Sequence, residues 1–395
     1  MQLYIKIKKR SAKEIFYYLF LVFCFIPFLF PNPIVRTNIQ PYAALLGTLI
    51  VVFRFNCLFR SPVGRKAGAI LGVTLLSSLF VMLIGGVSVE ALRGVYNYYA
   101  LFVIPCAVII VLEDMDDFPE TLCKTMIVLW FIVASIQFFI YRGFATQLIS
   151  SVRWSYRYRG VVGLASEPSF LGITCFYFLH LIRRFKTHRV LFNILTLIMG
   201  VLYAQSATGI MFIAGYYIVF LLDVINNRKG VYVWAGSIVA AASFLVYLNN
   251  NLTGSRLNQM LDAFLNGGVD NVLSDGSASI RINAIWRALG NAAGNMFLPN
   301  GFGSRIGSAY GGMLVEIGLF AIPAIILISF GLSVTFNKTI SKVVYFIVTT
   351  LLLLNNTQIG NPLLLLVIGT NLRYLIQSKR TQEVISVNDK IYQSA

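Results

Sequence analysis

The sequence predicts an all-α membrane protein, a polytopic bundle of about twelve transmembrane helices that forms one domain over residues 1–395. Hydrophobic residues make up 57% of the chain and charged residues only 12%, about half the charged fraction of a soluble domain. Apolar runs of bilayer-spanning length recur along the whole chain. The alternating pattern of a membrane β-barrel is absent, so these runs are expected to be helices.

The predicted spans alternate in direction, starting from a cytoplasmic N-terminus. The first residues are rich in lysine and arginine, which holds them in the cytoplasm. No small-residue cleavage site follows the first apolar run, so this run is expected to be a retained helix and not a signal peptide. An even number of spans then returns the C-terminus to the cytoplasm. The spans are expected at 15–30, 41–56, 67–86, 94–112, 122–141, 168–182, 190–205, 208–223, 231–248, 310–335, 343–356 and 361–377.

Positive residues divide unevenly between the two predicted sides. The predicted cytoplasmic loops and helix ends hold 22 of the 32 lysine and arginine residues, including all twelve lysines. The positive-inside rule explains this excess and most of the net charge of +17. Because the charges are scattered among membrane segments, nucleic acid is not an expected partner. The ten positive residues on the outer side are all arginine: Arg36, Arg93, Arg142, Arg153, Arg157, Arg159, Arg256, Arg281, Arg287 and Arg305.

An outer side with arginine but without lysine suggests anion recognition, because membrane insertion treats the two residues alike. The planar guanidinium grips phosphate or carboxylate with two parallel hydrogen bonds, whereas lysine is a point charge. Chance in a small sample is the alternative, and we favour it for the isolated Arg36 and Arg142. We favour recognition for the clustered arginines: Arg153, Arg157, Arg159, Arg281, Arg287 and Arg305.

Two outer loops are long enough to carry function. One covers 142–167 and is rich in arginine. The other covers 249–309 and contains amphipathic stretches, which predict short helices lying on the membrane surface. The five cysteines lie in apolar segments or beside inner loops, with no disulfide framework and no metal-type spacing.

The segment Ser166-Glu167-Pro168-Ser169 closes the first long loop and opens a span. Pro168 suits the first position of a helix, so Ser166 or Glu167 is expected to be the cap. Capping alone would account for an arbitrary segment of this kind. Here the segment lies just inside the membrane boundary on the arginine-rich side, where an ionisable residue is a functional candidate. Glu167 is therefore expected to be a general base for a sugar hydroxyl or a partner that orients an arginine, and the helix start a seat for phosphate.

Other polar segments have simpler interpretations. The glycine-rich bend at 299–304 either lets backbone approach a ligand or is a plain loop that re-enters the membrane. Glu316 lies in an apolar helix and needs a partner, expected to be structural, for which an outer arginine is the candidate. The acidic run at 113–117 is expected to be a solvated cytoplasmic loop, and the segment 205–209 a tight outer turn.

Some catalytic arrangements are excluded on the outer side. The two histidines, His180 and His188, are both predicted at the cytoplasmic end of a helix, so a Ser-His-Asp hydrolase site cannot be built outside. The outer side also lacks the paired carboxylates that would hold a metal and a nucleotide sugar. We therefore expect outer chemistry that requires no metal and no other cofactor.

The segment GLASEPSFLG at 163–172 resembles the Wzy-type O-antigen and capsule polymerases. These are polytopic glycosyltransferases of the bacterial inner membrane, related in fold to the lipid-carrier-dependent class C enzymes. The organisation is similar over the whole chain, with many helices, an arginine-rich loop in mid-chain and a large outer loop late in the chain. The segments SIRINAIWRA at 279–288 and PNGFGS at 299–304 resemble the family's Arg-Trp stretch and G-x-G segment.

The resemblance implies that the chain polymerises undecaprenyl-diphosphate-linked oligosaccharide repeats on the periplasmic face of the inner membrane. Its partners would be these lipid-linked oligosaccharides, membrane lipid and a separate chain-length regulator. A diphosphate leaving group needs arginines to take up its charge and a base for the acceptor hydroxyl. Glu167, Arg157 and Arg159 are the expected catalytic residues. The expected substrate-binding residues are Arg153, Arg281, Arg287, Arg305, Trp154 and Tyr158, with an interfacial aromatic belt as the simpler account of the two rings.

Three alternatives stay open. A flippase or other transporter of lipid-linked oligosaccharide would place its arginines in a central cavity, whereas here they lie in predicted outer loops. The related O-antigen ligases use an outer-loop histidine, which this chain lacks. The last alternative is a scaffold for envelope assembly.

Overall fold

The computed structural model describes residues 11–29, 39–60, 62–115, 118–149, 152, 160–224, 268, 276–303, 308–355 and 357–377. Within these ranges the regular structure is helical, and the only β-type pairing is an isolated bridge between Leu29 and Ile149. Five helices are long and apolar enough to cross a membrane. The predicted all-α membrane fold is thus confirmed, while the number of twelve spans stays a prediction.

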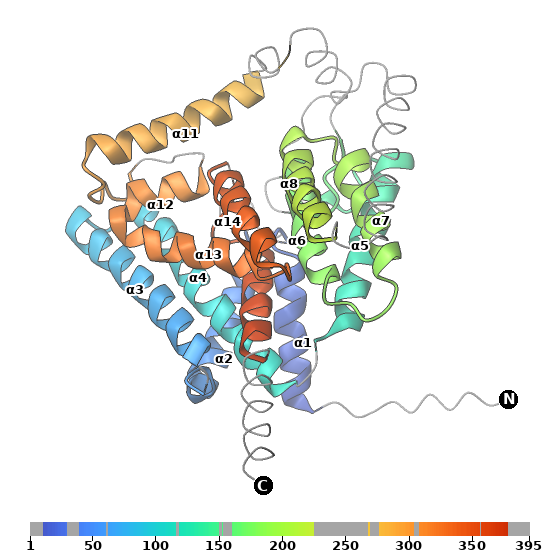
Figure 1. The fold of residues 1–395 in the computed structure, drawn as a ribbon, viewed down its shortest axis with the longest axis horizontal. Coiled ribbons are helices and arrows are strands. Elements are labelled where there is room, and N and C mark those ends of the chain that lie inside the picture. Colours follow the sequence, from blue (N-terminus) through green and yellow to red (C-terminus); the bar gives the residue numbers. More distant parts are fainter. Residues whose placement is uncertain are drawn as a thin grey trace, which may run out of the picture.

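The helices follow one another as shown in Figure 1. The first half of the chain contains α1 (Ala12–Phe25), α2 (Tyr42–Leu58), α3 (Pro62–Gly85), α4 (Val89–Asp114), α5 (Glu120–Phe139), the short η1 (Thr146–Leu148) and α6 (Pro168–Ile182). The second half contains α7 (Arg189–Leu197), the π-helical η2 (Ile198–Tyr203), α8 (Ala207–Val224), α11 (Gly276–Gly294), α12 (Ala309–Ile317), the short η3 (Gly318–Ala321), α13 (Ile322–Ser333), α14 (Thr339–Leu353) and a final helix at Pro362–Gln377.

Each predicted span except 231–248, which lies outside the described residues, coincides with helical residues. The span predicted at 310–335 is broken, because α12 ends where Gly318 adopts a φ of +62°. A side chain at Gly318 would overlap the carbonyl oxygen of Phe297, so only glycine fits this break. An apolar run shows that residues are buried in lipid or protein, but not that they form one unbroken helix.

The core of the bundle is built around α4, which is buried along most of its length and packs against α2 and α3. On α3, exposed apolar side chains recur at helical spacing. We call this row the lipid-facing surface of α3; it consists of Val73, Leu76, Phe80 and Leu83. An exposed apolar row on a helix of spanning length is typical of contact with lipid.

Ion pairs between described residues gather at one end of the bundle, which we call the basic end. At the basic end, the carboxylate of Asp114, in the last turn of α4, accepts the largest number of these contacts. Lys13 and Arg54 each reach it at 2.8 Å, and the hydroxyl of Tyr17 donates to it at 2.7 Å. The start of α1 and the ends of α2 and α4 are thereby joined.

Two further pairs at this end join later helices: Arg373–Glu113 at 2.6 Å and Arg183–Asp223 at 2.8 Å. A third, Lys124–Glu120 at 2.6 Å, lies within the first turn of α5. Every positive member of these pairs was predicted on the inner side. That this end faces the cytoplasm stays a prediction.

The prediction of a solvated loop at 113–117 is wrong for its first two residues. Glu113 and Asp114 are the last residues of α4 and their side chains are only 14% and 11% exposed. Three helix ends meet there, and they bring positive side chains that neutralise both carboxylates. Residues 116 and 117 lie outside the described residues.

Candidate functional site

The approach to Glu167 is a buried backbone segment, 160–166, held by a glutamine of α5. The Gln137 amide donates to the carbonyl of Gly163 at 2.8 Å, and its oxygen accepts from the Gly163 N–H at 2.7 Å. Gly163 has a φ of +59°, which glycine adopts without strain. Gly163, the first glycine of GLASEPSFLG, is therefore needed for the turn that leads into α6.

The same segment rests on the turn before α8. The Val161 N–H donates to the carbonyl of Tyr203 at 2.8 Å, and a side chain on Gly160 would overlap the carbonyl of Ala204. From the other side the guanidinium of Arg142 donates to the Gly160 carbonyl at 3.0 Å. Arg142 thus binds the backbone of its own loop, which agrees with leaving it out of the recognition set.

Glu167 is the N-cap residue of α6, and Pro168 takes the first helical position, as predicted. The backbone of Glu167 is extended, but its side chain makes no capping hydrogen bond. Instead the half-buried carboxylate accepts from the hydroxyl of Ser169 at 3.2 Å. The carboxylate therefore does not accept a hydrogen bond from the backbone N–H groups of its own helix, which is the usual role of an acid at this position.

The start of α6 offers fewer free backbone N–H groups to a phosphate than the sequence predicts. Pro168 has no N–H, and the N–H groups of Phe170 and Leu171 both donate to the Glu167 carbonyl at 3.1 Å. In this first turn the N–H of Ser169 is the one left for a ligand. Backbone groups alone therefore offer little here, and an anion would depend on side chains.

The last glycine of the segment has a packing role. A Cβ on Gly172 would lie 2.5 Å from the Cα of Gly209, so α6 and α8 cross with their backbones in contact. The 205–209 segment forms the predicted turn, with Gln205 at a φ of +43°. The crossing fixes the depth at which α6 begins, and with it the position of Glu167.

Polar side chains without hydrogen-bond partners are buried in the loops at the end opposite the basic end. The Ser166 hydroxyl is 1% exposed and has no partner. Thr357 and Gln358, between α14 and the final helix, also bury an oxygen without a partner. Gly360 of that loop packs against Asn97, near the start of α4. Because a buried polar atom without a partner is unfavourable, a polar ligand would be stabilised at such positions.

The two described arginines of the second cluster do not converge. Arg281 and Arg287 both lie on α11, but Arg281 is half-buried and Arg287 is exposed. Arg281 shares its face with Ala288 and Ala292, the buried alanines through which α11 packs on α12. Of the two predicted substrate-binding arginines, only Arg281 therefore faces the bundle.

Glu316 pairs with a tyrosine and not with the outer arginine that we considered. The Tyr98 hydroxyl, on α4, donates to its carboxylate at 2.7 Å. The glycine-rich bend covers the same place, since the N–H groups of Asn300 and Gly301 donate to the carbonyls of Val315 and Glu316. The ring of Phe302 then packs against Tyr98. The bend therefore caps the broken end of α12, which supports its interpretation as a loop that re-enters the bundle.

Six predicted site residues lie outside the described residues: Arg153, Trp154, Arg157, Tyr158, Arg159 and Arg305. Among the described ones, the sequence analysis missed Gln137 and Tyr98, and it gave Ser166 only a capping role. Gln137 could have been noticed as an amide within an apolar span. Nothing near Tyr98 in the sequence points to a carboxylate 218 residues away.

Both histidines are remote from this end. His180 is buried, with the hydroxyls of Thr335 and Tyr345 at 2.7 and 2.8 Å from its ring nitrogens. His188 caps the start of α7, beside the basic end. No group of three histidine, cysteine, aspartate or glutamate side chains gathers among the described residues.

The described candidate groups are the Glu167 carboxylate at the start of α6, the buried hydroxyls of Ser166 and Thr357, and the half-buried Arg281 of α11. Such a set can hold a polar, negatively charged ligand and take a proton from a hydroxyl. No known protein family, no curated protein and no solved structure matches the chain.

Proposed function

We propose that this chain is a membrane glycosyltransferase that joins lipid-diphosphate-linked oligosaccharide repeats into O-antigen or capsular polysaccharide, on the periplasmic face of the inner membrane. The proposal rests on the resemblance of residues 163–172 and on one observation. Glu167, an ionisable residue, occupies the cap position of α6, yet its side chain does not cap the helix. The arginine-rich segment 153–159 precedes it directly in the chain.

The chemistry needs few groups. The acceptor hydroxyl attacks the anomeric carbon of the donor, its oxygen forms the new glycosidic bond, and the bond from that carbon to the diphosphate breaks. Glu167 takes the proton of the hydroxyl. Arginines, with Arg157 and Arg159 as candidates, stabilise the charge that develops on the leaving lipid diphosphate.

The first prediction tests Glu167 in the native host. A strain without the gene is complemented with wild type, Glu167→Gln or Glu167→Asp, and its surface polysaccharide is separated on a gel. Glu167→Gln keeps the shape of the side chain but cannot take a proton at neutral pH, so we expect single repeats in place of the ladder. We expect Glu167→Asp to restore a weak ladder.

Glu90 supplies a matched control. It is another acid in the first turn of a helix, exposed and preceded by a serine that caps α4. Glu90→Gln should leave the ladder unchanged. A normal ladder from Glu167→Gln at equal protein level would remove Glu167 from catalysis.

A transporter of lipid-linked oligosaccharide is the second candidate, and one observation favours it. The break between α12 and α13 at Gly318 is of a kind found at transporter binding sites, with a carboxylate, Glu316, beside it. The same strain separates the two functions. Loss of a polymerase leaves single repeats at the surface, whereas loss of a flippase removes surface repeats and leaves lipid-linked units on the cytoplasmic leaflet.

A further inference from the structure

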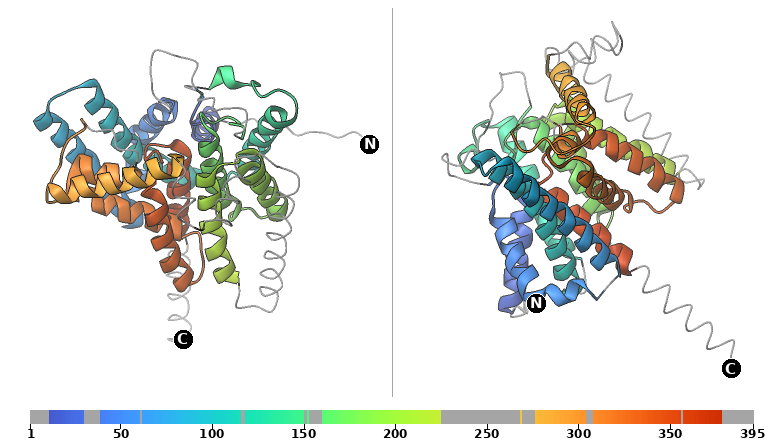
Figure 2. Two further views of the ribbon diagram at one scale, coloured as in Figure 1. Left: turned by 90° about the horizontal axis from the view of Figure 1, so that it is seen from above. Right: turned by 90° about the vertical axis from the view of Figure 1, so that its left-hand side faces the viewer.

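The helix α11 presents three different faces along its length. Figure 1 shows it lying across the end of the molecule away from the start of α1, and the right view of Figure 2 again shows it at the edge of the molecule. One face carries Arg281, Ala288 and Ala292 and packs toward α12. A side chain on Gly311 of α12 would lie 2.6 Å from Ala288, so the two helices approach closely on this side.

A second face is apolar. Ile282, Ile285, Trp286 and Leu289 have the spacing i, i+3, i+4 and i+7, which places them in one row. None of the four is buried, and Trp286 is 69% exposed. Ile282, Ile285 and Leu289 are half-buried, and Ile285 borders the alanine contact, so the row is uncovered mainly at Trp286.

The third face is mainly polar, with the exposed Ile280 at its start. Asn283, Arg287 and Asn291 recur every four residues and are all exposed. A helix with a bundle face, a partly uncovered apolar row and a mainly polar row on the other side has the amphipathic pattern of a helix at a boundary between lipid and water. Tryptophan is the side chain most enriched at that boundary, which suits the position of Trp286.

The residues around α11 indicate that lipid contacts its apolar row. Beyond its end the apolar surface continues through the exposed side chains of Met296 and Leu298. The chain then places Phe302 in a cluster with Met82 and Leu79, near the end of α3. Leu83, the last residue of the lipid-facing surface of α3, lies at this same end of α3. The apolar row of α11 and the lipid-facing surface of α3 therefore belong to one region of the molecule.

We propose that α11 is docked on the bilayer surface, with the row Ile282, Ile285, Trp286 and Leu289 in contact with lipid and the row Asn283, Arg287 and Asn291 in water. The occupant of the apolar row is phospholipid at headgroup depth. The proposal does not depend on the proposed function. If both hold, Arg281 lies where a lipid-borne diphosphate would be held, and Arg287 faces water.

The experiment scans both rows with a nitroxide label on introduced cysteines. The five native cysteines are all buried, so labelling reports the introduced thiol. The full-length variants Ile282→Cys, Trp286→Cys and Leu289→Cys test the apolar row, and Asn283→Cys, Arg287→Cys and Asn291→Cys are matched controls on the polar row. Each is reconstituted in vesicles of phosphatidylethanolamine and phosphatidylglycerol. Collision rates are then measured with oxygen, which partitions into lipid, and with a neutral nickel chelate, which stays in water.

We expect the ratio of oxygen to nickel collisions to rise on the apolar row and fall on the polar row, repeating with the helical period. Equal nickel access on both rows would place α11 wholly in water and overturn the proposal. Low access to both reagents on the apolar row would mean that protein covers it, a second copy or another chain, and would also overturn the proposal. If one variant fails to fold, the other members of its row still decide the outcome.

Discussion

At the scale of single residues, the carboxylates of this chain are distinguished by their partners. Asp114 is neutralised by Lys13 and Arg54, and Glu316 is held by the neutral hydroxyl of Tyr98. Glu167 likewise accepts from a neutral hydroxyl, that of Ser169. Acids held by formal charges thus stabilise the basic end, and acids held by hydroxyls lie in other parts of the molecule.

The Tyr98–Glu316 contact gives a prediction at this scale. Tyr98→Phe removes the donor to a half-buried carboxylate and should lower the free energy of unfolding by about 1–3 kcal/mol. Thermal unfolding in detergent would show this as a lower midpoint. Tyr96→Phe is the control, because that neighbouring ring is also partly buried. Equal midpoints for the two variants would show that the contact does not stabilise the fold.

At the scale of elements, glycines determine where helices approach and where they end. Gly172 and Gly209 let the backbones of α6 and α8 touch, and Gly318 ends α12. The sequence shows all three residues but not their roles, because those roles come from atoms distant in the chain. Residue 297 is what makes a side chain impossible at Gly318, and nothing in the apolar run around it signals this.

The α6–α8 crossing can be tested by adding one methyl group. Gly172→Ala would place a Cβ 2.5 Å from the Cα of Gly209, and neither backbone can move without shifting its helix. We expect a loss of about 1–3 kcal/mol in unfolding free energy. Gly290→Ala on α11 meets nothing within 4 Å and should be neutral or stabilising by about 0.5–1 kcal/mol. A neutral Gly172→Ala would mean that the helices cross less closely.

At the scale of the whole molecule, much of the fold was predictable, because apolar runs and the distribution of lysine depend only on local composition. The runs predicted the helices, and the lysines predicted the set of helix ends that meets at the basic end. What could not be predicted were contacts between distant residues, such as those of Glu113 and Asp114. The candidate site was predictable only at Glu167, through its proline-led helix start, and at the arginines of α11, whose different faces emerged only from packing.

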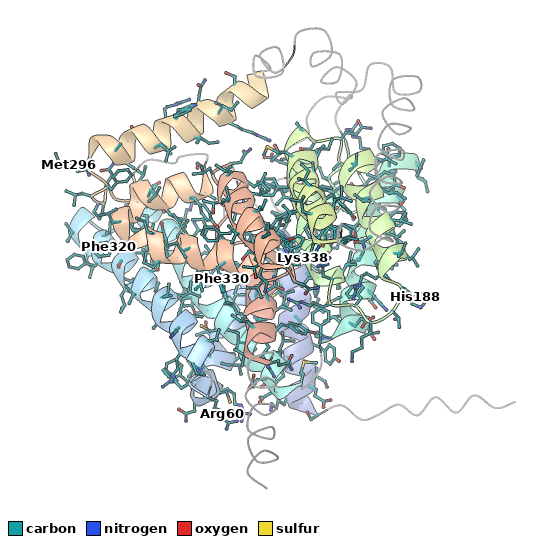
Figure 3. All side chains as sticks on the ribbon, viewed as in Figure 1. Arg60, His188, Met296, Phe320, Phe330 and Lys338 are labelled. Atoms are coloured by element: carbon teal, nitrogen blue, oxygen red, sulfur yellow. The ribbon has the colours of Figure 1, made fainter. Side chains whose placement is uncertain are left out.

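The two ends of the molecule should face opposite sides of a membrane. Figure 3 labels Arg60 near the basic end and Met296 at the far end of α11, and both side chains are exposed. With Asn291→Cys, on the polar row of α11, a membrane-impermeant maleimide should label intact spheroplasts, whereas Arg60→Cys should react only after permeabilisation. Because the native cysteines are buried, background should be low. Labelling of both variants from outside would contradict the alternation of the helices.

The arrangement of the ion pairs also makes the bundle mechanically asymmetric. Separating helices at the basic end would strip charged groups such as Asp114 and Arg373 of their partners, which costs several kcal/mol for each buried charge. At the other end α12 is broken and α11 rests on alanines, so less free energy opposes motion there. The helices would therefore separate more easily at the end away from the basic end. If the proposed function holds, the growing polymer would leave from this more weakly joined end.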